Sequence, residues 1–234
     1  WTDPTGRLWL FFMQAMNHWD GRGSLWSITC ENPDDNEPRW SEPKYIGHGL
    51  MLNKPVVLSS GEWLLPAYIV QNEHFRGFKP FINLFPELDP YRGVNVYASA
   101  DQGKNWTLRG IRTFPQPDWL EPMIVEKKNG QLWMMARTLN GIMESFSNDK
   151  GYTWSAPIST KPKISSTNAR FFFRRLSSGN LLLVKYGKEI NSYDTTRGNG
   201  RNPNGRNYLS AWLSEDDGTS WKGGLLVDDR PNIS

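Results

Sequence analysis

The sequence predicts an all-β fold in which a short antiparallel sheet is repeated along the chain, as in a β-propeller. An eight-residue pattern, S-x-D-x-G-x-x-W, occurs at residues 99–106, 147–154 and 214–221. A second pattern, a glycine turn followed by an apolar run, recurs between these copies. The composition includes 12 Trp, 21 Gly and 16 Pro, which is typical of short strands joined by tight turns. Self-similarity of this kind is the signature of a repeat architecture.

The eight-residue pattern has the residues that a tight hairpin turn requires. Its Asp side chain can accept hydrogen bonds from nearby backbone N–H groups, and its Gly can adopt a positive φ. The Trp that ends the pattern, such as Trp154, is expected to fold back beneath the turn as an apolar plug. These residues are therefore predicted to be structural and not catalytic.

The glycine turns precede the eight-residue pattern and complete a repeating unit. Together they give strand, Gly turn, strand, variable connection, strand, Asp–Gly turn and Trp strand, which is one four-stranded propeller blade. Blades are predicted at about residues 1–43, 53–108, 121–157 and 168–223. The first blade keeps only the Trp end of the turn pattern, at Trp40, and insertions are expected near 71–92 and 187–206.

We interpret residues 1–234 as a single propeller domain. We also expect it to be a fragment of a longer repeat protein, because an open arc of four blades would leave sheet faces and edges uncovered.

The composition argues against several classes of protein. The net charge is only +3 and no long basic run is present, so nucleic acid is not an expected partner. No apolar run approaches the roughly 18 residues that span a membrane. The one cysteine, Cys30, is expected to be a small buried residue. The three histidines lack ligand spacing, so neither zinc nor a cofactor is expected.

The turn pattern resembles the Asp-box of the sialidase (neuraminidase) superfamily, whose members are six-bladed β-propellers. The stretch Glu121–Arg137 is similar to a sialidase stretch in which a Glu is followed by a Gly turn and a strand that ends in Arg. The stretch from Arg206 into the last turn pattern is similar to a sialidase strand that carries an Arg and leads into an Asp-box. The resemblance covers the whole chain as a fold and these two stretches as a site.

The resemblance implies an exo-glycoside hydrolase that releases a terminal acidic sugar such as a sialic acid. Sialidases use a tyrosine nucleophile, an exception to the two-carboxylate rule, and a neighbouring Glu takes its proton. Glu121 matches this Glu, and Arg137 and Arg206 match two of three arginines that bind the sugar carboxylate bidentately. Asp20 is the best positioned candidate for the general acid. The remaining arginine of the three is expected before Trp1, and the tyrosine outside this sequence, soon after Ser234.

Local sequence context leaves two readings open for the main site residues. Glu121 begins an inner strand, so it either faces the central channel or forms an ion pair at the strand edge. Arg137 ends an apolar run in which an unpaired charge would be costly, so it belongs either to a site or to an ion pair with Glu121. Polar residues at equivalent strand starts, Asn53, Lys54 and Arg170, suggest a polar central pocket.

The remaining candidates have plain structural alternatives. His18 and Trp19 form either a sugar-stacking wall or half-buried loop aromatics, and Asp20 could equally be a turn residue before Gly21. Arg174 and Arg175 are expected to face solvent.

Two other functions stay open, because a fold alone does not determine an activity. One is a polysaccharide lyase, or another glycosidase, that acts beside a uronic acid with His18 or a tyrosine as base. The other is a non-catalytic carbohydrate-binding propeller. In each case the expected partner is a glycan or a small acidic sugar. The substrate class favours a secreted or periplasmic protein, although no signal peptide is visible, and nothing in the sequence indicates a particular oligomeric state.

Overall fold

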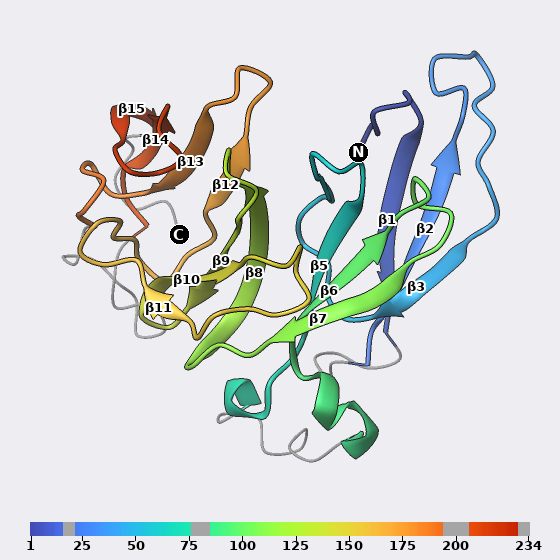
Figure 1. Cartoon of the computed structure of the whole chain (residues 1–234), viewed down its shortest axis with the longest axis horizontal. Helices are drawn as coiled ribbons and strands as arrows, with labels where there is room; N and C mark the ends of the chain where they lie inside the picture. The colour runs from blue at the N-terminus through green and yellow to red at the C-terminus, as the bar shows by residue number, and fades with distance from the viewer. Residues whose placement is uncertain (16–21, 76–84, 194–205, 229–234) are drawn as a thin grey trace. The chain divides into compact units, whose positions relative to one another are not determined.

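The computed structural model describes residues 1–15, 22–75, 85–193 and 206–228 (Figure 1). In this part of the chain the strands form four antiparallel sheets, and the strand order within each sheet follows the order along the chain. The predicted all-β, propeller-type fold is therefore confirmed. The chain divides into two compact units, Trp1–Arg112 and Thr113–Ser234, and each contains two of the sheets.

The first unit contains a three-stranded and a four-stranded sheet. The three-stranded sheet consists of β1 (Leu8–Gln14), β2 (Ser24–Cys30) and β3 (Lys44–His48). The four-stranded sheet consists of β4 (Val56–Val57), β5 (Trp63–Ile69), β6 (Gly93–Ser99) and β7 (Thr107–Arg112). The predicted insertion between β5 and β6 carries two short 3-10 helices, η1 (Asn72–Phe75) and η3 (Pro86–Tyr91). Thr2 forms an isolated bridge with Leu8, so the first sheet has three strands where a four-stranded blade is predicted. Cys30 is fully buried, as predicted.

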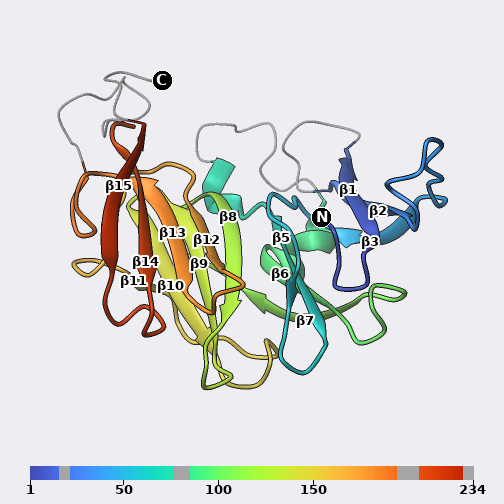
Figure 2. The same cartoon turned by 90° about the horizontal axis from the view of Figure 1, so that it is seen from above.

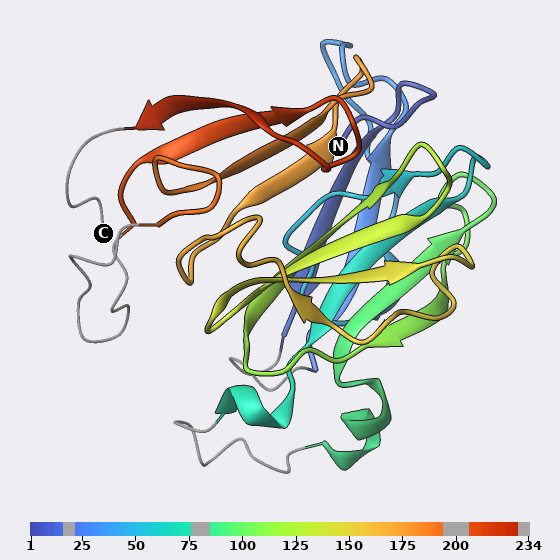
Figure 3. The ribbon, with the colours of Figure 1, turned by 60° about the vertical axis from the view of Figure 1, so that its left-hand side comes forward.

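The second unit contains two four-stranded sheets. One consists of β8 (Pro117–Glu126), β9 (Leu132–Thr138), β10 (Gly141–Ser147) and β11 (Ile158–Ser159). The other consists of β12 (Phe172–Arg175), β13 (Leu181–Tyr186), β14 (Leu209–Ser214) and β15 (Lys222–Asp228). The first strands of the two sheets, β8 and β12, lie beside each other (Figure 2), and β15 forms an outer edge (Figure 3). Strand β8 carries the main candidate residue, Glu121, at its start.

The apolar core of the second unit lies between its two sheets. Alternate residues of β8, β9, β12 and β13 point into it, as the period of two along a strand requires. Its largest members are Trp133, Phe173 and Trp212, and the ring centroids of Trp133 and Phe173 are 4.9 Å apart. This packing holds β8 and β9 in a fixed position under the candidate site.

The eight-residue pattern folds as the sequence predicts. In its second copy the Ser147 hydroxyl lies 2.7 Å from Oδ1 of Asp149 and accepts the N–H of Gly151 at 2.8 Å. The N–H of Thr153 donates to Asp149 at 2.9 Å. The Trp154 indole folds back and donates to the carbonyl of Gly151 at 3.1 Å, so it caps its own turn. Desolvation raises the pKa of Asp149, but hydrogen bonds from Thr153 and Ser147 outweigh it and hold the pKa at about 2.

The turn glycine has a second role, because it lies against a Trp of the preceding sheet. Gly103 lies against Trp9 of β1, and Gly218 lies against Trp133 of β9. Trp9 and Trp133 follow the glycine turns of their own sheets at equivalent positions and are almost fully buried. The two repeated sequence patterns therefore meet in space, with the turn of one sheet on the Trp of the sheet before it.

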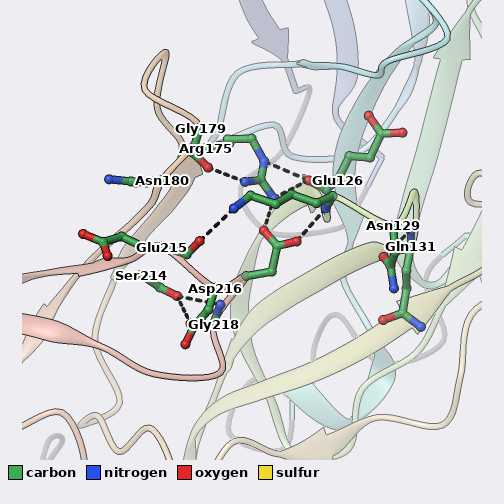
Figure 4. A network of polar contacts seen from close by, with 12 residues as sticks. Glu126, Asn129, Gln131, Arg175, Gly179, Asn180, Ser214, Glu215, Asp216 and Gly218 are labelled. Carbon is green, nitrogen blue, oxygen red and sulfur yellow. Dashed lines mark hydrogen bonds and ion pairs between the residues drawn. The ribbon is translucent and has the colours of Figure 1, made fainter.

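A network of hydrogen bonds and an ion pair also joins the two sheets of the second unit (Figure 4). Arg175 of β12 donates to Asp217 at 2.5 Å and to the carbonyl of Glu126 at 2.8 and 3.0 Å. The N–H of Lys128 donates to the second oxygen of Asp217 at 2.6 Å. The expectation that Arg175 faces solvent is therefore wrong. Its side chain reaches the Glu126 carbonyl of the neighbouring sheet and the Asp217 carboxylate in the β14–β15 turn of its own sheet.

A buried carboxylate organises the start of the first unit. Asp3 accepts hydrogen bonds from the Trp9 indole at 2.8 Å, the Thr5 hydroxyl at 2.7 Å and Nε of Arg7 at 2.8 Å. Burial raises the pKa of Asp3, but the hydrogen bonds from Trp9, Thr5 and Arg7 outweigh burial and lower the pKa to about 2. The ionised carboxylate is thus the stabilising form.

We expect Gly218→Ala to lower the free energy of unfolding more than Gly130→Ala. The two glycines have nearly the same φ, +82° and +81°, so both substitutions carry the same left-handed strain. A Cβ at Gly218 would overlap the Trp133 ring, whereas nothing lies within 4 Å of a Cβ at Gly130. Urea unfolding should show an additional loss of ~1–3 kcal/mol for Gly218→Ala. Equal losses would contradict the turn-on-Trp contact.

The first unit should lose stability in acid, and Asp3 should account for part of the loss. Its pKa of about 2 in the folded protein lies below the ordinary aspartate value of 3.8. The stabilisation is therefore complete above about pH 4 and disappears as the pH falls toward 2. Urea unfolding from pH 5 to pH 2 should show a smaller pH dependence in Asp3→Asn than in the exposed-site control Asp34→Asn. The same pH dependence in both variants would show that Asp3 is not responsible.

Candidate functional site

The first half of β8 is irregular, and its bulges place two acidic residues, Asp118 and Glu121, beside Arg137. Leu120 pairs with Arg137 of β9, but the register shifts on both sides of Leu120. Asp118 lies in the bulge before Leu120 and Glu121 lies in the bulge after it. Both carboxylates therefore flank the residue that faces Arg137 across the ladder. Bulges of this kind redirect side chains and are frequent near active sites.

The backbone between these carboxylates is left-handed. Trp119, Leu120 and Glu121 have φ values of 55°, 45° and 41°. Residues other than glycine avoid this left-handed region of φ and ψ, because it costs roughly 1–2 kcal/mol for each residue. Leu120 is fully buried and anchors the segment in the core. Conformations of this cost are retained where the surroundings enforce them, and they cluster at functional sites.

Arg137 is the centre of the resulting cluster. Its Nη2 lies 2.8 Å from Oδ2 of Asp118 and its Nη1 lies 3.3 Å from Oε2 of Glu121. Its Nε donates to Oδ1 of Asn168 at 3.0 Å, from the segment that leads to β12. Arg137 is 9% exposed and Glu121 is 8% exposed. The predicted proximity of Glu121 and Arg137 is thus observed, in the ion-pair form that the sequence allowed.

Arg206 lies in the same unit but three residues before β14, so it precedes the strand that leads into the turn pattern. Arg206 is half-buried, and among the described residues its buried Nε has no hydrogen-bond partner. An N–H that has lost water and gained no acceptor is unfavourable unless a ligand or water supplies one. Arg206 is therefore suited to bind an anionic group.

Three of the other predicted site residues, Arg170, Asn53 and Lys54, are described by the structure, and the rest lie outside the described residues. Arg170 is exposed in the segment before β12. Asn53 is half-buried and Lys54 is exposed, and both belong to the first unit. Asp20 and Trp19, together with His18, lie outside the described residues.

Asp118 and Asn168 are not among the residues predicted from the sequence. The predicted blade begins at about residue 121, whereas β8 begins at Pro117 and includes Asp118. An acidic residue three positions before Glu121 is the signal that could have identified it. Asn168 lies 31 residues from Arg137 and reaches it only through sheet-to-sheet packing, so no local pattern could have identified it.

In the described ranges the structure contains no cluster of three or more His, Cys, Asp or Glu side chains suited to a metal ion. None of the helices in the described part of the chain is long and apolar enough to cross a membrane.

Comparison with known proteins identifies the family to which the chain belongs. A family model described as a BNR repeat-like domain matches residues 1–234. A sialidase of Vibrio cholerae serotype O1 is 27% identical over 212 residues, which covers 77% of this chain and 24% of that protein. The chain therefore spans about a quarter of the length of this curated relative.

Two solved structures with a similar fold are a sialidase and a trans-sialidase. A Hadza microbial sialidase superimposes with a TM-score of 0.64 at 15% identity, over 97% of this chain and 44% of that one. The intramolecular trans-sialidase from Ruminococcus gnavus, solved with oseltamivir carboxylate, gives a TM-score of 0.50 at 18% identity, over 91% of this chain and 51% of that one. At these identities the likeness concerns the fold alone.

Removal of the Arg137 charge should strongly destabilise the second unit. In Arg137→Met the carboxylates of Asp118 and Glu121 would stay close together without their cation, and we expect the free energy of unfolding to fall by about 3–5 kcal/mol. The control is Arg174→Met, since Arg174 is a half-buried arginine of the same unit whose hydrogen bond within the described residues, to the Arg175 carbonyl, is long at 3.4 Å. Urea unfolding measures both. Equal stability of the two variants would contradict a buried ionic cluster at Arg137.

Proposed function

We propose that this chain, which belongs to the family of BNR repeat-like domains and through it to the sialidase superfamily, forms part of a glycoside hydrolase that releases a terminal acidic sugar from glycans. The observation that carries the proposal is the contact between Glu121 and Arg137 at the bulged start of β8. The carboxylate and the guanidinium are both about nine-tenths buried, and Glu121 lies on a strained segment, which is more than a fold requires.

Glu121 is proposed to accept a proton from the nucleophile. In a sialidase-type reaction the sugar carbon that reacts also carries a carboxylate, which would repel an anionic nucleophile. A hydroxyl nucleophile avoids the repulsion but needs a base within hydrogen-bond reach. Glu121 is held at a fixed position by Arg137 and by the core residue Leu120 beside it. A rigid base of this kind fits that role.

Arg137 and Arg206 are proposed to bind the sugar carboxylate. A guanidinium presents a planar fork of N–H groups that matches a carboxylate. The buried and unpartnered Nε of Arg206 supports its part in this role. The guanidinium of Arg137 also forms ion pairs with Asp118 and Glu121. These ion pairs affect how Arg137 can bind a ligand.

The remaining assignments rest on the resemblance to sialidases. Asp20 is proposed as the general acid that protonates the leaving oxygen. Asn53, Lys54, Arg170 and Trp19 are proposed to contact the sugar.

The proposal predicts that the protein hydrolyses a fluorogenic α-sialoside and that Glu121→Gln lowers kcat/KM by about 10²–10⁴-fold, the range for loss of a general base. Gln keeps the size of the side chain and removes its ability to accept the proton. Release of the fluorophore measures the rate. Glu215→Gln is the control, because Glu215 is an exposed residue of the same unit that pairs with Lys222.

Other outcomes would point to a different function. An unsaturated sugar product that absorbs in the ultraviolet would replace hydrolysis by a lyase reaction. Binding of the sialoside without turnover, at equal affinity in Glu121→Gln, would indicate a carbohydrate-binding propeller. Either result would contradict the proposed hydrolase.

A further inference from the structure

All three nitrogens of the Arg137 guanidinium contact oxygens of the protein itself. Each of its three nitrogens lies within 3.3 Å of a protein oxygen, from Asp118, Glu121 and Asn168. The shortest of these contacts, 2.8 Å, is to Asp118. A charge-assisted bond of this length is the interaction that an incoming carboxylate would also form. A ligand carboxylate and Asp118 therefore compete for the same group.

The charges of the cluster make this competition unfavourable for an anion. Asp118 and Glu121 carry two formal negative charges and Arg137 carries one positive charge, so the three residues sum to −1. Their side chains are 15%, 11% and 11% exposed, respectively for Asp118, Glu121 and Arg137, so water screens them poorly. An acidic sugar that approaches Arg137 meets a negative cluster for as long as Asp118 stays in place.

Asp118 is the member of the cluster that can leave. It lies in a bulge between the ladder pairs Pro117–Thr138 and Leu120–Arg137, so its movement breaks no register pair. It is the more exposed of the two carboxylates. Glu121 has a further interaction in addition to its ion pair with Arg137, and it is therefore held more firmly.

We propose that Asp118 is a specificity-determining residue, an internal carboxylate that occupies Arg137 and that an acidic sugar must displace in order to bind. The identity of the ligand rests on the proposed function, whereas the competition rests on the geometry of the cluster. Asp118 weakens the binding of acidic sugars and leaves the binding of the corresponding neutral sugars almost unchanged. The site thus discriminates against weakly held anions and admits those that also contact other cations, such as Arg206.

The test is calorimetric binding of N-acetylneuraminic acid and of its methyl ester to the wild-type protein and to Asp118→Asn. Asn keeps the shape of the side chain and removes the competing charge. We expect the acid to bind about 10- to 100-fold more tightly to Asp118→Asn, the factor that corresponds to one charge-assisted hydrogen bond. The affinity of the methyl ester should change less than threefold, because the ester has no charge to exchange.

Two further variants make the result specific. Asp217→Asn removes a carboxylate that pairs with another arginine of the same unit, Arg175, and should leave the affinity for the acid unchanged. Asp118→Ser removes the competing carboxylate with a smaller side chain and should tighten binding of the acid in the same direction as Asp118→Asn. Folding of each variant is checked by circular dichroism.

The inference is overturned if both Asp118 variants are folded and bind the acid no more tightly than the wild-type protein. If the wild-type protein hydrolyses the sialoside in that case, the proposed function stands without the inference. If Asp118→Asn binds the acid more tightly but no variant hydrolyses the sialoside, the inference stands and the proposed hydrolase is wrong.

Discussion

The charge of Arg137 is the constraint on which the candidate site depends. This guanidinium is 9% exposed at the end of an apolar strand, where an unpaired charge would cost several kcal/mol. The chain meets the requirement with Asp118 and Glu121, which reach Arg137 only because β8 bulges on both sides of Leu120. Three left-handed residues follow from this arrangement. Strain of roughly 1–2 kcal/mol for each is offset by the ion pairs and by burial of Leu120.

The frame that holds this site is built from a different set of residues. The repeated turns are stabilised by hydrogen bonds of their own Ser and Asp side chains. Their glycines pack against the Trp of the preceding sheet, as Gly218 packs against Trp133. Trp133 belongs to β9, the strand that ends in Arg137, so the turn contact fixes the strand whose end carries the charge. Fold and site are thus linked through β9, although no residue of the turn pattern takes part in the Arg137 cluster.

The sequence predicted what depends on local patterns. The strand and turn repeats and the all-β fold follow from periodicity and spacing, whereas the ion pair of Glu121 with Arg137 is one of two readings that the cost of an unpaired charge leaves open. Asp118 was missed because a bulge lengthens β8 beyond the regular strand, and regular alternation cannot indicate a bulge. Asn168 and the inward position of Arg175 depend on contacts between sheets, which single-strand patterns do not contain. The roles of Asp20 and Arg206 rest on family resemblance, so they remain predictions.

In this proposal Arg137 binds the carboxylate of the ligand, and Asp118 forms an ion pair with Arg137 when no ligand is bound. The most direct measurement is a crystal structure of the protein with N-acetylneuraminic acid bound. We expect the sugar carboxylate to lie within hydrogen-bond distance of the Arg137 guanidinium. We also expect Asp118 to have moved away from its 2.8 Å contact with Arg137. A bound sugar whose carboxylate lies elsewhere, with the contact between Asp118 and Arg137 intact, would contradict it.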